Sequence, residues 1–394
     1  MPIPPRSWTV LLLSAVTALT ACSPSGTAAT RAPARTAAAS AAPLVGTGAP
    51  ASAPASPPAL SLDQAIGQVT IASTAATQVD DGLRHLILDD KVGAVLLFRS
   101  NFGNAAGLAH WTHDLQALGR QAGLPAPLVV MVDEEGGSVM QVRDGVAQLP
   151  SALELGRQGM GALRRAVAAN ASGLRALGVE LDLAPDADLR TNPNDAVIGD
   201  RSFGTDPAVV GPLVAAAVAG LHDGGVGATL KHFPGLGGAP GNPHVAVPTD
   251  SIDAARWRAT DARTFAAGIA AGADCVMTTA VRVPSLDATG TPAMFSAPML
   301  ALLRHDLGFN GVIVTDSLSM GGVQAIHAIP DSAVLALKAG NDWVMLGNGD
   351  AAYQHSAIVA MRAAVADGRV SLDQVRASAQ RVALLAQRWA PAPT

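Results

Sequence analysis

Apolar and polar residues follow one another along this chain in blocks whose lengths suit buried strands separated by helices. Seven apolar runs are continuous instead of alternating with polar residues, which is typical of parallel strands buried on both faces. These runs cover residues 92–98, 127–132, 179–184, 226–231, 275–280, 311–315 and 342–347. Ala-rich segments of helical length lie between them, for example at 207–221, 261–271 and 332–339. The pattern predicts an α/β fold of the (β/α)-barrel type, with its site at the C-terminal ends of the strands.

Helix signals also stand at both ends of this region. Ser61 and Gln64 form a capping-box pattern, which predicts the start of a first helix. Two further helices are predicted at 351–366 and 372–388, and we expect them to pack on the outside of the barrel. An eighth strand is not evident from the pattern. Residues 61–394 suffice for one barrel of about 250 to 330 residues, so we expect a single catalytic domain.

The first residues predict export from the cell. Arg6 precedes an apolar stretch at 8–21, which is too short to span a bilayer but suits the core of a signal peptide. The sequence Leu-Thr-Ala-Cys at 19–22 resembles a bacterial lipobox, in which the chain is cut before the cysteine and Cys22 is lipidated. The alternative is an ordinary cleaved signal in which Cys22 is incidental. Residues 1–22 are therefore predicted to be a signal peptide of a membrane-anchored lipoprotein, with a secreted protein as the alternative.

Residues 23–60 are predicted to form a disordered linker. They are almost entirely Ala, Pro, Ser, Thr and Gly, and they have too little apolar surface to offset the entropy of ordering. A largely extended, Pro-rich tether of this kind reaches about 3 Å per residue. It would hold an anchored domain several nanometres from the membrane.

Charge and cysteine content narrow the range of partners. The net charge of −5 argues against nucleic acid as a partner. The chain has two cysteines, and Cys275 lies in an apolar run, where we expect a small buried strand residue. If Cys22 is lipidated, Cys275 has no partner for an intramolecular disulfide. We expect the protein to be a monomer.

The polar residues that follow the apolar runs carry the candidate chemistry. One run ends in Lys231 and His232, and a loop rich in Gly and Pro that contains His244 comes next. Asp316 follows the uncharged run at 311–315, where it is either a carboxylate at the barrel mouth or the N-cap of a helix. Because the C-terminal strand ends of a barrel meet at one rim, these side chains are candidates for one site.

Five segments together resemble glycoside hydrolase family 3, in its branch of single-domain β-N-acetylglucosaminidases. They are residues 95–101, 132–137, 197–203, 231–248 and 314–320, in the order in which the family carries them. The resemblance spans nearly all of the chain after residue 60. It implies a (β/α)8-type TIM barrel, often irregular at its first strand in this family, and a retaining exo-glycosidase.

The resemblance also implies catalytic residues. Asp316 aligns with the nucleophile, an ionised carboxylate that forms a covalent glycosyl-enzyme. His244 matches the histidine that acts as general acid and base in this branch. Asn242 stands where the family usually has an aspartate, and its amide oxygen can orient the imidazole but cannot stabilise an imidazolium as a carboxylate does. We therefore expect His244 to be a weaker base.

Further residues are implied as groups that bind the sugar in the site. They are Asp133, Arg201, Lys231 and His232. Asp133 accepts hydrogen bonds from hydroxyls whereas Lys231 and Arg201 donate them, and such complementary groups fix the orientation of a polyol. Glu135 is expected beneath the site, where it accepts hydrogen bonds from backbone or arginine. Taken singly, Arg201 could instead pair with its neighbour Asp200.

These residues predict a retaining exo-glycosidase that releases terminal β-N-acetylglucosamine, with peptidoglycan fragments as the expected saccharide substrates. Two alternatives stay open. One is a β-glucosidase of the same fold, and the other is a non-catalytic saccharide-binding lipoprotein, which Asn242 favours. No cofactor and no metal is expected, because His232 with His244 is an insufficient ligand set. Contact with the membrane is expected through the lipid anchor only.

Overall fold

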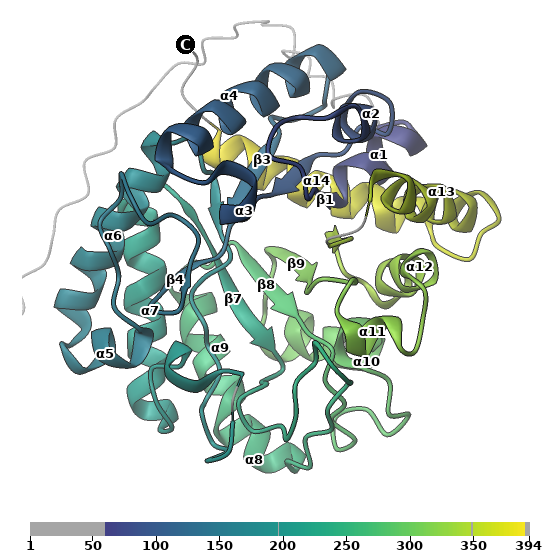
Figure 1. Cartoon of the computed structure of the whole chain (residues 1–394). Coiled ribbons are helices and arrows are strands. Elements are labelled where there is room, and N and C mark those ends of the chain that lie inside the picture. Colours follow the sequence, from purple (N-terminus) through teal and green to yellow (C-terminus); the bar gives the residue numbers. More distant parts are fainter. Residues whose placement is uncertain (1–59, 196, 348–349, 391–394) are drawn as a thin grey trace, which may run out of the picture. The chain divides into compact units, whose positions relative to one another are not determined.

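The computed structural model describes residues 60–195, 197–347 and 350–390, and within them eight parallel strands form a barrel (Figure 1). The strands are β1 (Thr70–Ser73), β2 (Ala94–Leu96), β3 (Val129–Val132), β6 (Leu181–Asp182), β7 (Gly227–Phe233), β8 (Cys275–Thr278), β9 (Val312–Thr315) and β10 (Val344–Met345). Their order in the sheet is β10-β1-β2-β3-β6-β7-β8-β9. A parallel bridge between Val314 and Trp343 joins β9 to the start of β10, so the sheet closes on itself. The predicted (β/α)8 barrel is confirmed.

The strand that the sequence pattern did not reveal is β1. It begins two residues after helix α1 (Leu62–Gln68), which starts at the predicted capping box of Ser61 and Gln64. An apolar strand that directly follows the apolar face of a helix has no boundary in the hydrophobic pattern. The strand itself pairs regularly, with Thr70 opposite Val344 and Ile71 opposite Ala94. The irregular register among the eight lies in β7, between Leu230 and Phe233, and not at the first strand.

Helices surround the barrel and connect its strands. The longer ones are α2 (Asp81–Leu88), α4 (Ala105–Ala122), α6 (Met160–Ala176), α7 (Pro207–Asp223), α9 (Asp261–Ala270), α12 (Ile329–Ala339), α13 (Ala351–Ala366) and α14 (Leu372–Trp389). Shorter elements lie in the connections: α3 (Arg99–Phe102), α5 (Ala152–Arg157), η1 (Gly199–Arg201), α8 (Ala254–Ala259), η2 (Ala293–Phe295), α10 (Ala297–Ala301), η3 (Leu302–Asp306) and α11 (Gly321–Gln324). An antiparallel hairpin of β4 (Glu134–Gly136) and β5 (Val139–Met140) follows β3.

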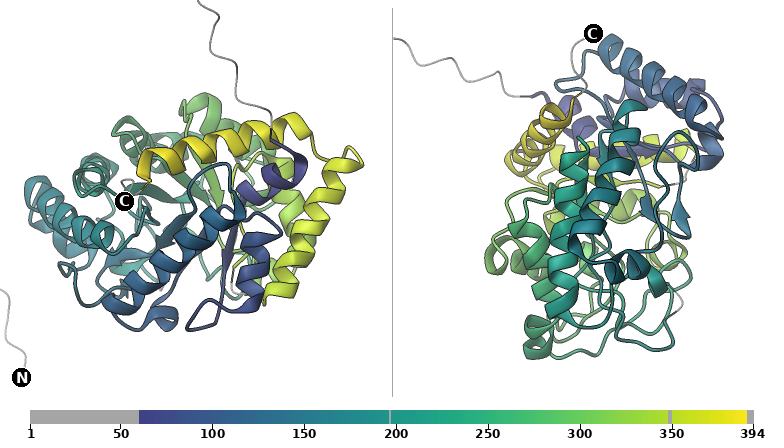
Figure 2. Two further views of the ribbon diagram at one scale, coloured as in Figure 1. Left: turned by 90° about the horizontal axis from the view of Figure 1, so that it is seen from above. Right: turned by 90° about the vertical axis from the view of Figure 1, so that its left-hand side faces the viewer.

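The two tail helices both pack on the outside of the barrel, as expected, but at different positions. Helix α13 lies on the outer wall next to α2 and α12. Helix α14 lies across the N-terminal ends of the strands (Figure 2), where Leu385 and Trp389 belong to the same apolar cluster as the barrel interior. Its arginines Arg381 and Arg388 bind acidic residues that directly precede β10 and β8. The apolar face of α14 therefore closes the lower end of the barrel.

Buried polar residues also lie at the C-terminal strand ends, among them Asp182, Lys231 and His232. Cys275 is buried in β8, as expected for a small strand residue.

Among the described residues, no helix is both long enough and apolar enough to cross a bilayer. The predicted signal peptide, Cys22 and the linker at 23–60 lie outside the described residues, so these assignments stay predictions.

Candidate active site

A buried ion cluster occupies the rim where β7 ends. The Nζ atom of Lys231 lies 2.6 Å from Asp133 Oδ1 and 2.6 Å from Glu135 Oε1. The guanidinium of Arg201 binds the same glutamate with two hydrogen bonds, Nε to Oε2 at 2.7 Å and Nη2 to Oε1 at 2.8 Å. Lys231 and Glu135 have side-chain exposures of only 2% and 3%. The cluster therefore joins β7, the β4–β5 hairpin and η1.

The ionised forms of Glu135 and Lys231 are each stabilised by neighbouring groups of opposite charge. Burial alone would raise the pKa of Glu135, but the positive charges of Lys231 and Arg201 outweigh burial and lower this pKa to about 2. Burial would lower the pKa of Lys231, yet the charges of Asp133 and Glu135 raise it above its ordinary value. Glu135 accepts two hydrogen bonds from Arg201. Arg201 pairs with Glu135, and not with exposed Asp200.

The neighbours of His232 fix its tautomer. Its Nε2 lies 3.3 Å from Arg201 Nη2, which can only donate, so Nε2 accepts and the proton lies on Nδ1. The Nδ1 atom is 2.7 Å from Asp188 Oδ2, the acceptor that this proton needs. The other oxygen of Asp188 accepts the backbone N–H of Leu236 at 2.6 Å. One buried aspartate thus orients the imidazole and also anchors the loop that follows β7.

Sequence reasoning missed Asp188 and its neighbour Asp186. A usable signal was present, because both residues follow an apolar strand, as Asp316 does. Burial, with the charge of Asp188, raises the pKa of Asp186 well above its ordinary value, and its buried Oδ2 has no hydrogen-bond partner. Ligand atoms of Asp186, Asp188 and His232 lie within 4.8 Å of one another. However, all three side chains are buried, and the guanidinium of Arg201 lies 3.3 Å from His232 Nε2 and 3.8 Å from Asp186, so a positive charge already occupies the open side of this group. This group is therefore a poor fit for a metal ion.

Asp316 lies on the same rim, two strands from Lys231. Backbone hydrogen bonds from Thr279 N to Phe233 O and from Asp316 N to Thr278 O connect the ends of β7, β8 and β9. Both carboxylate oxygens accept a hydrogen bond at 2.7 Å, Oδ2 from Thr279 Oγ1 and Oδ1 from Ser317 N. These two bonds fix the plane of the carboxylate. The alternative role as a helix N-cap is excluded, because the next helix, α11, has Met320 at its N-cap.

His244 is exposed and lies on a loop that packs against the start of α11. The N–H of Gly322 donates to Pro243 O at 3.0 Å, and a Cβ at Gly321 would lie only 2.4 Å from His244 O. The close approach requires glycine at both positions. The loop that carries His244 therefore lies against the segment that follows Asp316 in sequence.

Asn242 does not orient the imidazole as expected. Its Oδ1 accepts the backbone N–H of His244 at 2.9 Å, and its backbone oxygen accepts the N–H groups of Val245 and Ala246. An Asn side chain commonly bonds the backbone two residues further on, because this closes a turn of favourable size. Asn242 thus shapes the loop through hydrogen bonds to the backbone.

The closed parallel barrel and the paired carboxylates and cations at its C-terminal rim define an enzyme site of the TIM-barrel class. The sequence pattern of the Glycosyl hydrolase family 3 N terminal domain matches residues 61–385. The chain belongs to glycosyl hydrolase family 3, and the family expected from the five segments is confirmed.

Individual relatives agree with this assignment. The chain is 36% identical over 287 residues to a β-hexosaminidase of Stenotrophomonas maltophilia (strain K279a), over 71% of this chain and 82% of the relative. It is 38% identical to a β-hexosaminidase of Xylella fastidiosa (strain M23), over 66% of this chain and 77% of the relative.

Solved structures resemble the fold closely. A family 3 β-N-acetylglucosaminidase from Paenibacillus sp. str. FPU-7 has a TM-score of 0.82 at 35% identity, covering 85% of this chain. This chain spans 64% of the length of that protein. A β-N-acetylhexosaminidase from Beutenbergia cavernae has a TM-score of 0.77 at 32% identity, covering 83% of this chain and 98% of the other.

The ion cluster makes a prediction about stability. Glu135→Gln should lower the free energy of unfolding by about 3–5 kcal/mol at pH 7, because it leaves Lys231 and Arg201 buried with less negative charge. Folding lowers the pKa of Glu135 from 4.5 to about 2, so its stabilisation is present above pH 4.5 and is lost as the pH falls towards 2. Urea denaturation of both proteins between pH 3 and pH 7 measures the loss and its pH dependence.

Asp200→Asn is the matched control, because Asp200 is exposed and adjacent to Arg201 in sequence. It should change the free energy of unfolding by no more than about 0.5 kcal/mol. Equal losses in the two variants would show that the cluster does not depend on Glu135.

Proposed function

We propose that this protein is a retaining exo-β-N-acetylglucosaminidase, with Asp316 as nucleophile and His244 as general acid and base. The observation that carries the proposal is the position of Asp316, a doubly hydrogen-bonded carboxylate on the same rim as the cluster of Lys231, Arg201 and Asp133. The names of the β-hexosaminidase relatives support the choice of sugar. A β-glucosidase of the same fold is the alternative that a substrate panel decides.

The proposed reaction has two steps. In the first, a carboxylate oxygen of Asp316 attacks the anomeric carbon, the glycosidic C–O bond breaks, and His244 gives its proton to the leaving oxygen. In the second, His244 takes a proton from water, and the hydroxide attacks the same carbon and releases Asp316. Two inversions give net retention of configuration.

The ion cluster suits recognition of sugar hydroxyls. Asp133 is its more accessible carboxylate, with 22% of its side chain exposed, and Lys231 holds it through Oδ1. Oδ2 of Asp133 is then the acceptor for a hydroxyl of the sugar. Arg201 is 17% exposed and uses Nε and Nη2 for Glu135, which fixes the plane of the guanidinium. His232 adds an imidazole whose tautomer is fixed by Asp188 and Arg201.

Peptidoglycan fragments are the proposed source of the substrate. Support comes from the predicted signal peptide and lipobox, which would retain the enzyme at the cell membrane and give it access to the cell wall through the linker. Cys22 is the residue on which this part of the proposal depends.

The role of Asp316 predicts a severe loss of turnover on substitution. Asp316→Asn is nearly isosteric but cannot attack the anomeric carbon, so kcat on an aryl β-N-acetylglucosaminide should fall by several orders of magnitude. A fluorinated, activated N-acetylglucosaminide should label the wild type at Asp316, as peptide mass spectrometry can detect. Asp331→Asn, at an exposed helix position, is the control and should keep full turnover. Labelling at another residue, or an active Asp316→Asn variant, would refute the assignment.

The role of His244 predicts a dependence on the leaving group. His244→Ala should reduce turnover of a natural disaccharide by about 10²–10⁴-fold, because its leaving oxygen needs a proton. Turnover of an aryl glycoside with an acidic phenol should fall far less. Exposed His305 provides the control variant His305→Ala. If both substrates lose activity equally, His244 is not the general acid, and a protein that binds both but cleaves neither supports the non-catalytic alternative.

If the protein is lipid-anchored, Cys22 determines whether it is found in the membrane fraction or in the soluble fraction. Wild-type protein expressed in a bacterial host should partition into the detergent phase, and Cys22→Ser should move it to the soluble exported fraction. Cys275→Ser is the control and should leave the distribution unchanged. Equal distribution of wild type and Cys22→Ser would support an ordinary secreted enzyme.

A further inference from the structure

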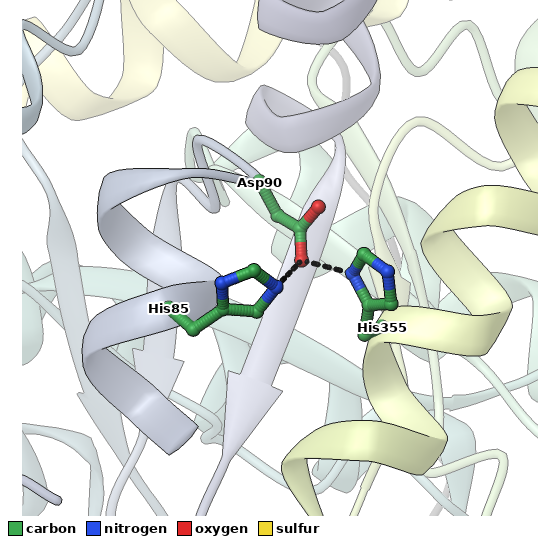
Figure 3. A group of neighbouring side chains, drawn as sticks. All are labelled: His85, Asp90 and His355. Carbon is green, nitrogen blue, oxygen red and sulfur yellow. Dashed lines mark hydrogen bonds and ion pairs between the residues drawn. The ribbon is translucent and has the colours of Figure 1, made fainter. Parts of the chain in front are cut away.

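A group of metal-ligating side chains lies on the outer wall of the barrel, away from the site described above. His85 lies in α2, Asp90 follows this helix, and His355 lies in α13 (Figure 3). The two helices follow β1 and β10, which are neighbours in the sheet. The group therefore joins the first and last parts of the barrel.

The three side chains converge on one oxygen atom. Asp90 Oδ2 lies 2.7 Å from His355 Nδ1 and 3.8 Å from His85 Nε2, and Figure 3 shows both imidazoles directed towards it. One ligand atom from each residue lies within 4.8 Å of the others. The side chain of Asp90 is almost fully buried, whereas His85 and His355 are 48% and 39% exposed. One side of the group is thus open to solvent.

A neighbouring carboxylate sets the tautomer of His85. Its Nδ1 lies 2.8 Å from Asp89 Oδ2, and an ionised carboxylate can only accept, so a neutral imidazole carries its proton on Nδ1. The lone pair on Nε2 then faces the carboxylate of Asp90, and two acceptors oppose each other across 3.8 Å. A carboxylate behind a histidine is the arrangement that orients metal-binding imidazoles. A cation between Nε2 and Oδ2 would satisfy both atoms.

We propose that His85, Asp90 and His355 bind a divalent transition-metal ion, with Zn²⁺ as the probe that tests it. Ligand atoms in a tetrahedral zinc site lie about 3.3 Å from one another, given bond lengths of about 2.0–2.2 Å. The His85–Asp90 separation of 3.8 Å is longer than this value by roughly half an ångström, and the His355–Asp90 separation of 2.7 Å is shorter by a similar amount. His355 has to release its Nδ1 proton and move outward by roughly half an ångström. Water completes the coordination on the exposed side.

Arg362 influences both the orientation of Asp90 and the affinity of this site for a cation. Its Nη1 binds Asp90 Oδ1 at 3.0 Å, which holds the carboxylate with Oδ2 directed towards the two imidazoles. The positive charge of Arg362 also opposes cation binding, so the affinity is lower than in a closed structural zinc site. A bound ion would connect α2 to α13 and so stabilise the closure of the barrel between β1 and β10.

The test is zinc binding to the full-length protein by isothermal titration calorimetry, with His85→Ala and His355→Ala as variants. Both histidines are partly exposed, so the variants should fold and keep wild-type glycosidase activity in the absence of metal. We expect about one equivalent of Zn²⁺ in the wild type and at least tenfold weaker binding in each variant. Zinc should raise the melting temperature of the wild type but not of these two variants.

His113→Ala is the matched control, because His113 is an exposed histidine beside an aspartate, Asp114, on another helix. Its zinc affinity should equal that of the wild type. The proposal is overturned if the wild type binds no zinc, or if His85→Ala and His355→Ala bind it as tightly as the wild type. Substituting Co²⁺ and recording its visible spectrum adds a readout of ligand geometry that does not depend on catalysis.

Discussion

The arrangement of the rim depends on the carboxylate of Glu135, which Lys231 and Arg201 share, with Asp133 as a second partner of Lys231. Removing a single ion from water costs several kcal/mol, so Lys231 and Arg201 can be buried only if their charges meet opposite charges at hydrogen-bond distance. Glu135 supplies both contacts at 2.6–2.8 Å. Because the three residues come from β7, η1 and the β4–β5 hairpin, this one carboxylate holds three separate segments in register.

A further buried carboxylate, that of Asp188, supports this arrangement. Asp188 sets the tautomer of His232 and anchors the loop after β7 through Leu236 N. That loop continues to His244 and packs on the glycines at the start of α11, in the segment after Asp316. The position of the exposed histidine is thus linked, through backbone contacts, to the segment that carries the proposed nucleophile.

At the opposite end of the barrel, ion pairs attach helix α14 to the starts of the strands. Asp274 and Asp342 stand just before β8 and β10 and bind Arg388 and Arg381 of α14, while apolar residues of this helix fill the opening. The interior residues at this end are buried, among them Cys275 and Met345. The polar groups at the other rim are thereby left as the place where a ligand can bind, which is the usual division of a TIM barrel.

The sequence by itself determined the strand and helix pattern, the residues at the strand ends and the family. Continuous apolar runs mark strands buried on both faces, and a charged residue at the end of such a run, as at Lys231 and Asp316, marks the rim. Strand β1 could not be predicted, because it directly follows the apolar face of α1 and shows no separate boundary. Only the tertiary structure decided that Glu135 pairs with both cations, that Asn242 bonds the backbone, that α14 closes the barrel, and that His85 meets His355. These outcomes depend on which distant segments share one small volume, and a local pattern of polarity carries no information about the partner that a buried charge will find.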